Sequence, residues 1–237
     1  MGDYRVSVWY SCGVTSACAA KIVREQCKRP IDVIYCNTLM FEHPDNIRFM
    51  RDTEEWIGQR IKILRSSKYD NIVDVFLRTG WLVGHNGARC TLELKRRPRE
   101  EYCQPGDIDI FGFDADEVKR SIQFSQNNPE LNLRYPLIEA GLNKQDCINM
   151  LLQAGIKLPA MYELGFKNNN CRICVKGGMG YWNLVRIRFP DLFYLMCWVE
   201  RKIGFHIHDC YLDELDPERG NYKTELSIEC GPVCDIK

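Results

Sequence analysis

The chain has 237 residues, of which 45% are apolar, 27% charged and 11% aromatic. This composition supports a sizeable core and excludes a chiefly disordered chain, and the length fits one large or two small domains. The 32 basic residues balance 32 acidic residues, which excludes a whole-protein electrostatic attraction to nucleic acid or membrane. The sequence has no signal-like N-terminus and no run of about 18 apolar residues, so we expect a soluble, cytoplasmic protein with no membrane partner.

Strand and helix patterns alternate through the first half of the chain. The predicted strands are residues 4–10, 31–36, 61–64 and 108–113, and the predicted helices are residues 15–26, 44–57, 71–78 and 115–124. Strands that alternate with helices predict an α/β fold with a doubly wound, mainly parallel sheet covered on both faces. A ligand is then expected beyond the carboxyl ends of the strands.

The pattern changes in the second half. A helix is predicted at residues 144–152, and another from about residue 182 into the aromatic stretch 189–199. The last 35 residues show little periodicity but contain two cysteines. The sequence therefore predicts an α/β domain over residues 1–135, and a helical and irregular, cysteine-containing region over residues 136–237 that packs on it.

The first predicted strand is joined to the first predicted helix by the tight polar turn Ser-Cys-Gly-Val-Thr-Ser, residues 11–16. Small residues allow backbone N–H groups to point at an anion, and the hydroxyls of Ser11, Thr15 and Ser16 add donors. The following helix contributes its positive N-terminal end. The turn predicts a phosphate cradle, with the alternative that these residues merely end a strand and cap a helix.

Cysteines are unusually frequent. The chain has 13 of them, and an odd number without a secretion signal argues against a disulfide framework and for metal or redox chemistry. Cys171 and Cys174 form a Cys-x-x-Cys turn that can present two thiolates to one zinc or iron–sulfur centre. Cys230 and Cys234 form a second pair in the tail.

The densest basic cluster spans residues 89–99. It contains Arg89, Lys95 and three further arginines, which suit nucleotide phosphates or sulfate. The alternative is a solvated helix face that Glu93, Glu100 and Glu101 partly neutralise.

These motifs occur in the order of the phosphoadenosine phosphosulfate (sulfonucleotide) reductases, in the PP-loop adenine nucleotide alpha-hydrolase superfamily. Residues 11–16 resemble the PP-loop, and residues 35–45 resemble the strand end that contacts adenosine. Residues 90–98 are similar to the family's Cys-Cys-x-x-Arg-Lys-x-x-Pro segment, and residues 159–174 resemble its Pro-Leu-Tyr-x-x-Gly-Tyr segment and cysteine pair. The tail, from Arg219-Gly220 to Glu-Cys-Gly at residues 229–231, looks like the reductases' carboxy-terminal motif.

The resemblance implies an adenine nucleotide-like fold and a set of site residues. Cys230 would be the nucleophile that attacks the sulfur of the nucleotide sulfate. A [4Fe–4S] cluster, or zinc as the alternative, would be held by Cys90, Cys171, Cys174 and Cys234. The implied nucleotide-binding residues are Ser11, Cys12, Gly13, Val14, Thr15, Ser16, Asn37, Thr38, Arg89, Lys95 and Arg219.

Three functions remain open. The first is a reductase of adenylyl sulfate or its 3′-phosphate, an oxidoreductase that releases sulfite with thioredoxin or glutaredoxin as reductant. The second is an ATP-using PP-loop sulfur transferase that acts on a nucleic-acid base with an iron–sulfur cluster. The third is a nucleotide-binding module in which Cys230 and Cys234 complete a structural zinc site with Cys171 and Cys174. A homodimer is left open in each case.

Overall fold

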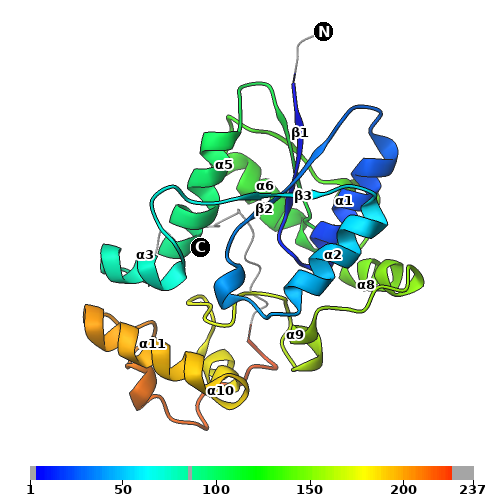
Figure 1. The fold of residues 1–237 in the computed structure, drawn as a ribbon. Helices are drawn as coiled ribbons and strands as arrows, with labels where there is room; N and C mark the ends of the chain where they lie inside the picture. The colour runs from blue at the N-terminus through cyan, green and yellow to red at the C-terminus, as the bar shows by residue number, and fades with distance from the viewer. Residues whose placement is uncertain (1–3, 85–86, 226–237) are drawn as a thin grey trace.

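The computed structural model describes residues 4–84 and 87–225, and its centre is a five-stranded parallel sheet (Figure 1). The strand order is β3-β2-β1-β6-β7, with every neighbouring pair parallel. The doubly wound, mainly parallel sheet predicted from the sequence is confirmed. The strands are β1 (Val6–Tyr10), β2 (Asp32–Cys36), β3 (Ile61–Leu64), β6 (Ile108–Phe111) and β7 (Asn132–Arg134).

Side chains along each strand alternate between the two faces of the sheet, and each face has its own hydrophobic core. Val8 and Tyr10 of β1 join a cluster with the inner sides of α1 (Val14–Gln26), α2 (Asn46–Ile57) and α8 (Lys144–Gln153). Trp9 points to the opposite face, where Phe111 and Phe124 pack under α5 (Arg97–Tyr102) and α6 (Val118–Asn127). Both faces of the sheet are therefore covered, as parallel strands require.

Short elements connect these layers. They are η1 (Leu39–Phe41), α3 (Ile72–Thr79), β4 (Val83–Gly84), β5 (Gly87–Ala88), α4 (Arg89–Thr91), the π-helical η2 (Leu92–Arg96), η3 (Ala115–Glu117), α7 (Pro136–Glu139), α9 (Ala160–Glu163) and η4 (Leu212–Glu214). The strand β7 was not predicted from the sequence, whereas the helical run from α4 to α5 agrees with the alternative of a helix face over the basic segment.

The C-terminal helices lie beyond the end of the sheet toward which β1 runs (Figure 1). They are α10 (Met179–Arg188) and α11 (Pro190–Ile203), and they form a third core with α3. The sequence predicted one helix here, but Pro190 has no N–H to continue α10, and Phe189 separates the two helices. In the described ranges no helix combines the length and the apolarity needed to cross a bilayer.

Gly112, directly after β6, allows that strand to approach the start of α1 closely. A Cβ atom at position 112 would lie 2.9 Å from both the backbone N and the Cα of Ser16, which is closer than Cβ atoms in real proteins come to such neighbours. Because Gly112 has no side chain, the turn at residues 11–16 can pack directly against the end of β6.

We expect Gly112→Ala to lower the free energy of unfolding by about 1–3 kcal/mol, because backbone must shift to admit the methyl group. The matched control is Gly13→Ala. Gly13 has φ −101°, and its added Cβ would make an ordinary 3.5 Å contact with Ser11, so its cost should be smaller. Urea unfolding measures the free energy of unfolding of both variants. Equal stability of Gly112→Ala and the unmodified protein would contradict the close approach.

Candidate functional site

The turn between β1 and α1 lies where ligands bind in open α/β sheets. β1 is the middle strand, with β2 on one side and β6 on the other, so the chain connections diverge at this point. Such a divergence opens a crevice outside the carboxyl ends of the strands. The residues after Tyr10 therefore sit at the position that the fold favours for a ligand.

Hydrogen bonds within the turn fix its shape. The Ser16 Oγ accepts from the backbone N–H groups of Ser11 at 3.1 Å and Gly13 at 3.3 Å, and it donates to the Gly13 carbonyl at 3.0 Å. The Ser16 hydroxyl is thus engaged in hydrogen bonds within the turn. Gly13 is the N-cap of α1 and has no side chain to accept from the first turn, so N–H groups there can face an anion.

Cys12 contributes its backbone to the turn and keeps its thiol inside the protein. Its φ of +61° is left-handed, a conformation that a residue with a Cβ rarely adopts. The thiol is buried, 3.6 Å from both the Tyr10 hydroxyl and the Asn46 carbonyl oxygen. Burial, reinforced by the nearby Glu42, raises the pKa of the Cys12 thiol well above its usual value, so this cysteine remains protonated and unreactive.

A pocket opens in front of the turn. Its volume is about 290 Å³, including solvent at its mouth. The structure brings four predicted binding residues together here with five residues from the second half of the chain that were not predicted to bind the ligand. The lining residues are Ser11, Gly13, Val14, Thr15, Lys144, Tyr162, Asn168, Asn169 and Asn170.

Lys144 supplies positive charge to this lining. It is the first residue of α8, and Asn143 caps that helix by accepting from the Asp146 N–H at 3.0 Å. The Lys144 ammonium donates to the Lys167 carbonyl at 3.0 Å and to the Asn168 side chain, and lies 5.6 Å from the Tyr162 ring centroid. A cation opposite the N-terminal end of α1 suits an anionic ligand.

Asn37 and Thr38 lie apart from the pocket lining. The Thr38 hydroxyl donates to Glu42 at 2.6 Å inside the protein. The Asn37 side chain accepts from the Leu39 N–H at 3.3 Å. Both predicted residues therefore shape the end of β2 in this structure, and a nucleotide contact by either of them stays a prediction.

The predicted basic cluster is engaged with its own acids. Arg89 and Arg97 both form ion pairs with Glu93, whose side chain is 1% exposed. Arg89 lies 2.8 Å from Glu93, four residues away on the same helical run. Lys95 is buried, and Arg219 pairs at the surface with Asp209 at 2.6 Å. None of Arg89, Lys95 and Arg219 lines the described pocket.

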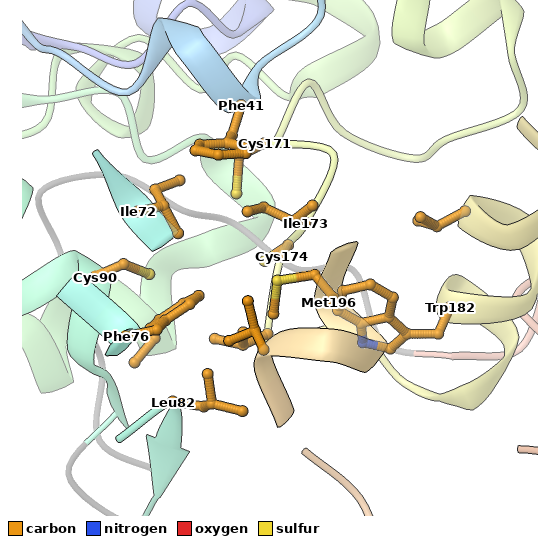
Figure 2. Close-up of a cluster of buried hydrophobic side chains, with 14 of the residues drawn as sticks. Phe41, Ile72, Phe76, Leu82, Cys90, Cys171, Ile173, Cys174, Trp182 and Met196 are labelled. Carbon is orange, nitrogen blue, oxygen red and sulfur yellow. The ribbon is translucent and has the colours of Figure 1, made fainter. Parts of the chain in front are cut away.

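The cysteines predicted as metal ligands lie in the third core. Cys90, Cys171 and Cys174 are buried members of one hydrophobic cluster. Figure 2 shows them among apolar side chains that include Phe41, Ile72 and Phe76. Within residues 4–84 and 87–225, no three His, Cys, Asp or Glu side chains lie close enough together to hold a metal ion. The described thiols alone therefore do not fit a [4Fe–4S] cluster, and Cys234, the fourth predicted ligand, lies outside the described residues.

The chain from Asp216 to Glu225, which we call the strap, crosses the start of α10. The Glu225 carboxylate accepts from the N–H groups of Gly180 at 2.6 Å and Tyr181 at 3.1 Å. A Cβ on Gly180 would come within 2.3 Å of the Tyr222 backbone N. The strap thus ends at the first turn of α10. The predicted nucleophile, Cys230, follows the strap and lies outside the described residues.

The fold is similar to that of a known reductase. No protein-family model and no curated protein matches the sequence. Among solved structures, the phosphoadenylyl-sulfate (PAPS) reductase from Candida auris, described as a phosphate complex, matches with a TM-score of 0.50 and 12% identity. The match covers 72% of this chain and 82% of the reductase chain. The chain therefore has the α/β fold of a PAPS reductase, as its motifs predicted.

We expect Lys144→Gln to weaken binding of inorganic phosphate by roughly tenfold, because a charge-assisted hydrogen bond in the pocket is lost. Lys119→Gln is the matched control, since Lys119 is exposed and does not line the pocket. Isothermal titration calorimetry at low salt measures both dissociation constants. Equal weakening by the two substitutions would show that only net charge matters.

Proposed function

We propose that the protein binds an adenine nucleotide sulfate, adenylyl sulfate or its 3′-phosphate, and reduces it to sulfite. The observation that carries the proposal is the turn at residues 11–16, which faces Lys144 across a pocket at the carboxyl edge of a sheet with the fold of a PAPS reductase. Ser11, Gly13, Val14 and Thr15 line this pocket together. Hydroxyls, helix N–H groups and one ammonium are the donors that a phosphate or sulfate group requires.

The proposed reaction is a thiol attack followed by reduction. The Cys230 thiolate attacks the sulfate sulfur, a sulfur–sulfur bond forms, and the sulfur–oxygen bond to the nucleotide breaks. The nucleotide leaves with the electron pair of that bond, and the enzyme carries a thiosulfonate. A dithiol protein of the thioredoxin or glutaredoxin class then donates two electrons, releases sulfite, restores the thiol and becomes a disulfide.

The strap supports this assignment of Cys230. Glu225 is hydrogen-bonded to the start of α10, and Cys230 follows five residues later. A chain advances at most about 3.6 Å per residue, so five residues span at most about 18 Å. In this proposal Cys230 acts beyond the carboxyl ends of the strands, the side on which α10 lies (Figure 1).

The ATP-using sulfur transferase receives less support. That chemistry uses Mg²⁺ near a carboxylate in the PP-loop, where this chain has Thr15. The described pocket lining contains hydroxyls, amides and Lys144, but no carboxylate. The arginines at 89, 96 and 97, which would suit a nucleic acid, are paired with Glu93 and Glu100.

Replacing Cys230 with serine should reduce sulfite release by roughly a thousandfold or more, because the covalent nucleophile is lost. Nucleotide binding should persist. The assay is anaerobic, with either nucleotide sulfate and a thioredoxin system, and it measures sulfite. Cys27→Ser is the control, since Cys27 is half-buried and outside the pocket. Full turnover by Cys230→Ser would refute the assigned nucleophile, and ATP-dependent pyrophosphate release with RNA or DNA would favour the transferase.

A metal centre at the Cys171–Cys174 loop, with Cys90 and Cys234 as the further ligands that the resemblance implies, is a separate proposal. We expect Cys171→Ser and Cys174→Ser to lose the metal that anaerobically purified protein carries, because each removes a thiolate. Metal analysis with acid-labile sulfide distinguishes iron–sulfur from zinc, and Cys27→Ser again serves as control. Unchanged metal content in both variants, or metal-free unmodified protein, would contradict a site at this loop.

A further inference from the structure

Lys167 lies between the strap and the pocket and is hydrogen-bonded to residues of both. Its backbone N–H donates to the Tyr222 hydroxyl at 2.8 Å, and its carbonyl accepts from the Lys144 ammonium at 3.0 Å. The Lys167 side chain also contacts the strap, because its ammonium donates to the carbonyls of Lys223, at 3.0 Å, and Glu225. One residue therefore connects the strap to the cation that lines the pocket.

Tyr222 attaches the strap to the chain that precedes the pocket wall. It is the only aromatic residue among residues 216–225. Its ring centroid lies 5.9 Å from that of Phe166 and 6.0 Å from that of Tyr181. The ring supplies apolar contact, and the hydroxyl supplies a directed acceptor for the Lys167 N–H. The two contributions can be separated, because phenylalanine keeps the ring and lacks the hydroxyl.

The Lys144 ammonium depends on neighbouring acceptors for its position. A lysine side chain has a flexible four-carbon stem, so its charged group is ordered only where contacts hold it. Two acceptors of this ammonium are the Lys167 carbonyl and the Asn168 side chain. A displacement of residues 167 and 168 would therefore displace the ammonium. A cation that is already ordered binds an anion more tightly, because less side-chain entropy is lost on binding.

We propose that Tyr222 is a positioning residue for the anion pocket, and that its hydroxyl acts through Lys167 to hold the Lys144 ammonium in place. The inference rests on one part of the proposed function, the binding of a phosphate or sulfate group in this pocket. Tyr222 does not line the pocket, so its effect on a ligand passes through other residues. By thermodynamic linkage, a strap contact that strengthens anion binding is itself strengthened by the bound anion to the same extent.

Tyr222→Phe tests the role of the hydroxyl. We expect this variant to bind inorganic phosphate roughly fivefold more weakly, which is about the effect of one lost hydrogen bond. Isothermal titration calorimetry at pH 7 and low salt measures the dissociation constant. Tyr194→Phe is the matched control, since Tyr194 is exposed and outside the pocket lining. An unchanged dissociation constant in Tyr222→Phe would overturn the proposal.

A double-mutant cycle with Lys144→Met separates positioning from a general loss of structure. Methionine keeps a similar stem but has neither the charge nor the donors of lysine. In this background, removal of the Tyr222 hydroxyl should change phosphate affinity by less than about twofold, because no ammonium is left to position. A general loosening of the fold would weaken binding by the same factor in both backgrounds. Equal factors would therefore overturn the proposal.

Hydrogen exchange at the Lys167 amide tests the linkage without altering Tyr222. The unmodified protein and Lys144→Met are compared at the same ratio of phosphate to dissociation constant, so the general stabilisation by bound ligand is equal. We expect phosphate to slow this exchange by up to roughly fivefold more in the unmodified protein. Equal slowing in the two proteins would overturn the proposal, even if Tyr222→Phe does not fold.

The outcomes separate this inference from the proposed function. Coupling between Tyr222 and Lys144 in phosphate binding, without sulfite release from either nucleotide sulfate, would support the role of Tyr222 and refute the proposed reaction. Sulfite release by a protein whose phosphate affinity is unaffected by Tyr222→Phe would refute the role of Tyr222 and leave the reaction standing. Failure of the unmodified protein to bind phosphate would overturn the inference together with the anion pocket.

Discussion

The hydrogen bond from the Asn169 amide to the Cys12 carbonyl joins segments that lie 157 residues apart, and the pocket depends on this junction. On one side is the turn that follows β1. On the other is the chain that leads into the Cys171–Cys174 loop. Lys144 holds the second segment through the Lys167 carbonyl. A buried polar junction of this kind specifies one arrangement of two segments, because misplacing either would leave paired groups unmet.

Steric constraints act together with this junction. Gly112 lets β6 approach the start of α1, and Gly180 lets the strap cross the start of α10. In both places a backbone segment occupies the space that a Cβ would need. The close packing at the starts of these two helices therefore requires glycine at both positions. The start of α1 lines the proposed anion site, and the start of α10 binds the strap through Glu225.

The positive charge in the pocket does not come from the segment of the chain that is richest in basic residues. The segment from 89 to 99 is the most basic in the chain, yet Arg89, Arg96 and Arg97 pair with Glu93 and Glu100 four residues away along the helix. Lys144, at the start of α8, lines the pocket instead. Helical pairing neutralises a local run of charge, whereas a single cation brought in from a distant element retains its effect on a ligand.

The sequence by itself determined the α/β architecture, most element positions and the turn at residues 11–16, because strand alternation, helical spacing and turn composition are local properties. It did not reveal β7, a strand of three residues, and it offered the helices from residue 89 to 102 only as an alternative to a phosphate-binding cluster. Lys144 and Asn169 carried no local signal beyond a helix start and an asparagine run. The tertiary structure alone decided that they line the pocket with Ser11 and Thr15, since hydrogen bonds between distant segments form only after the sheet and its helices have assembled.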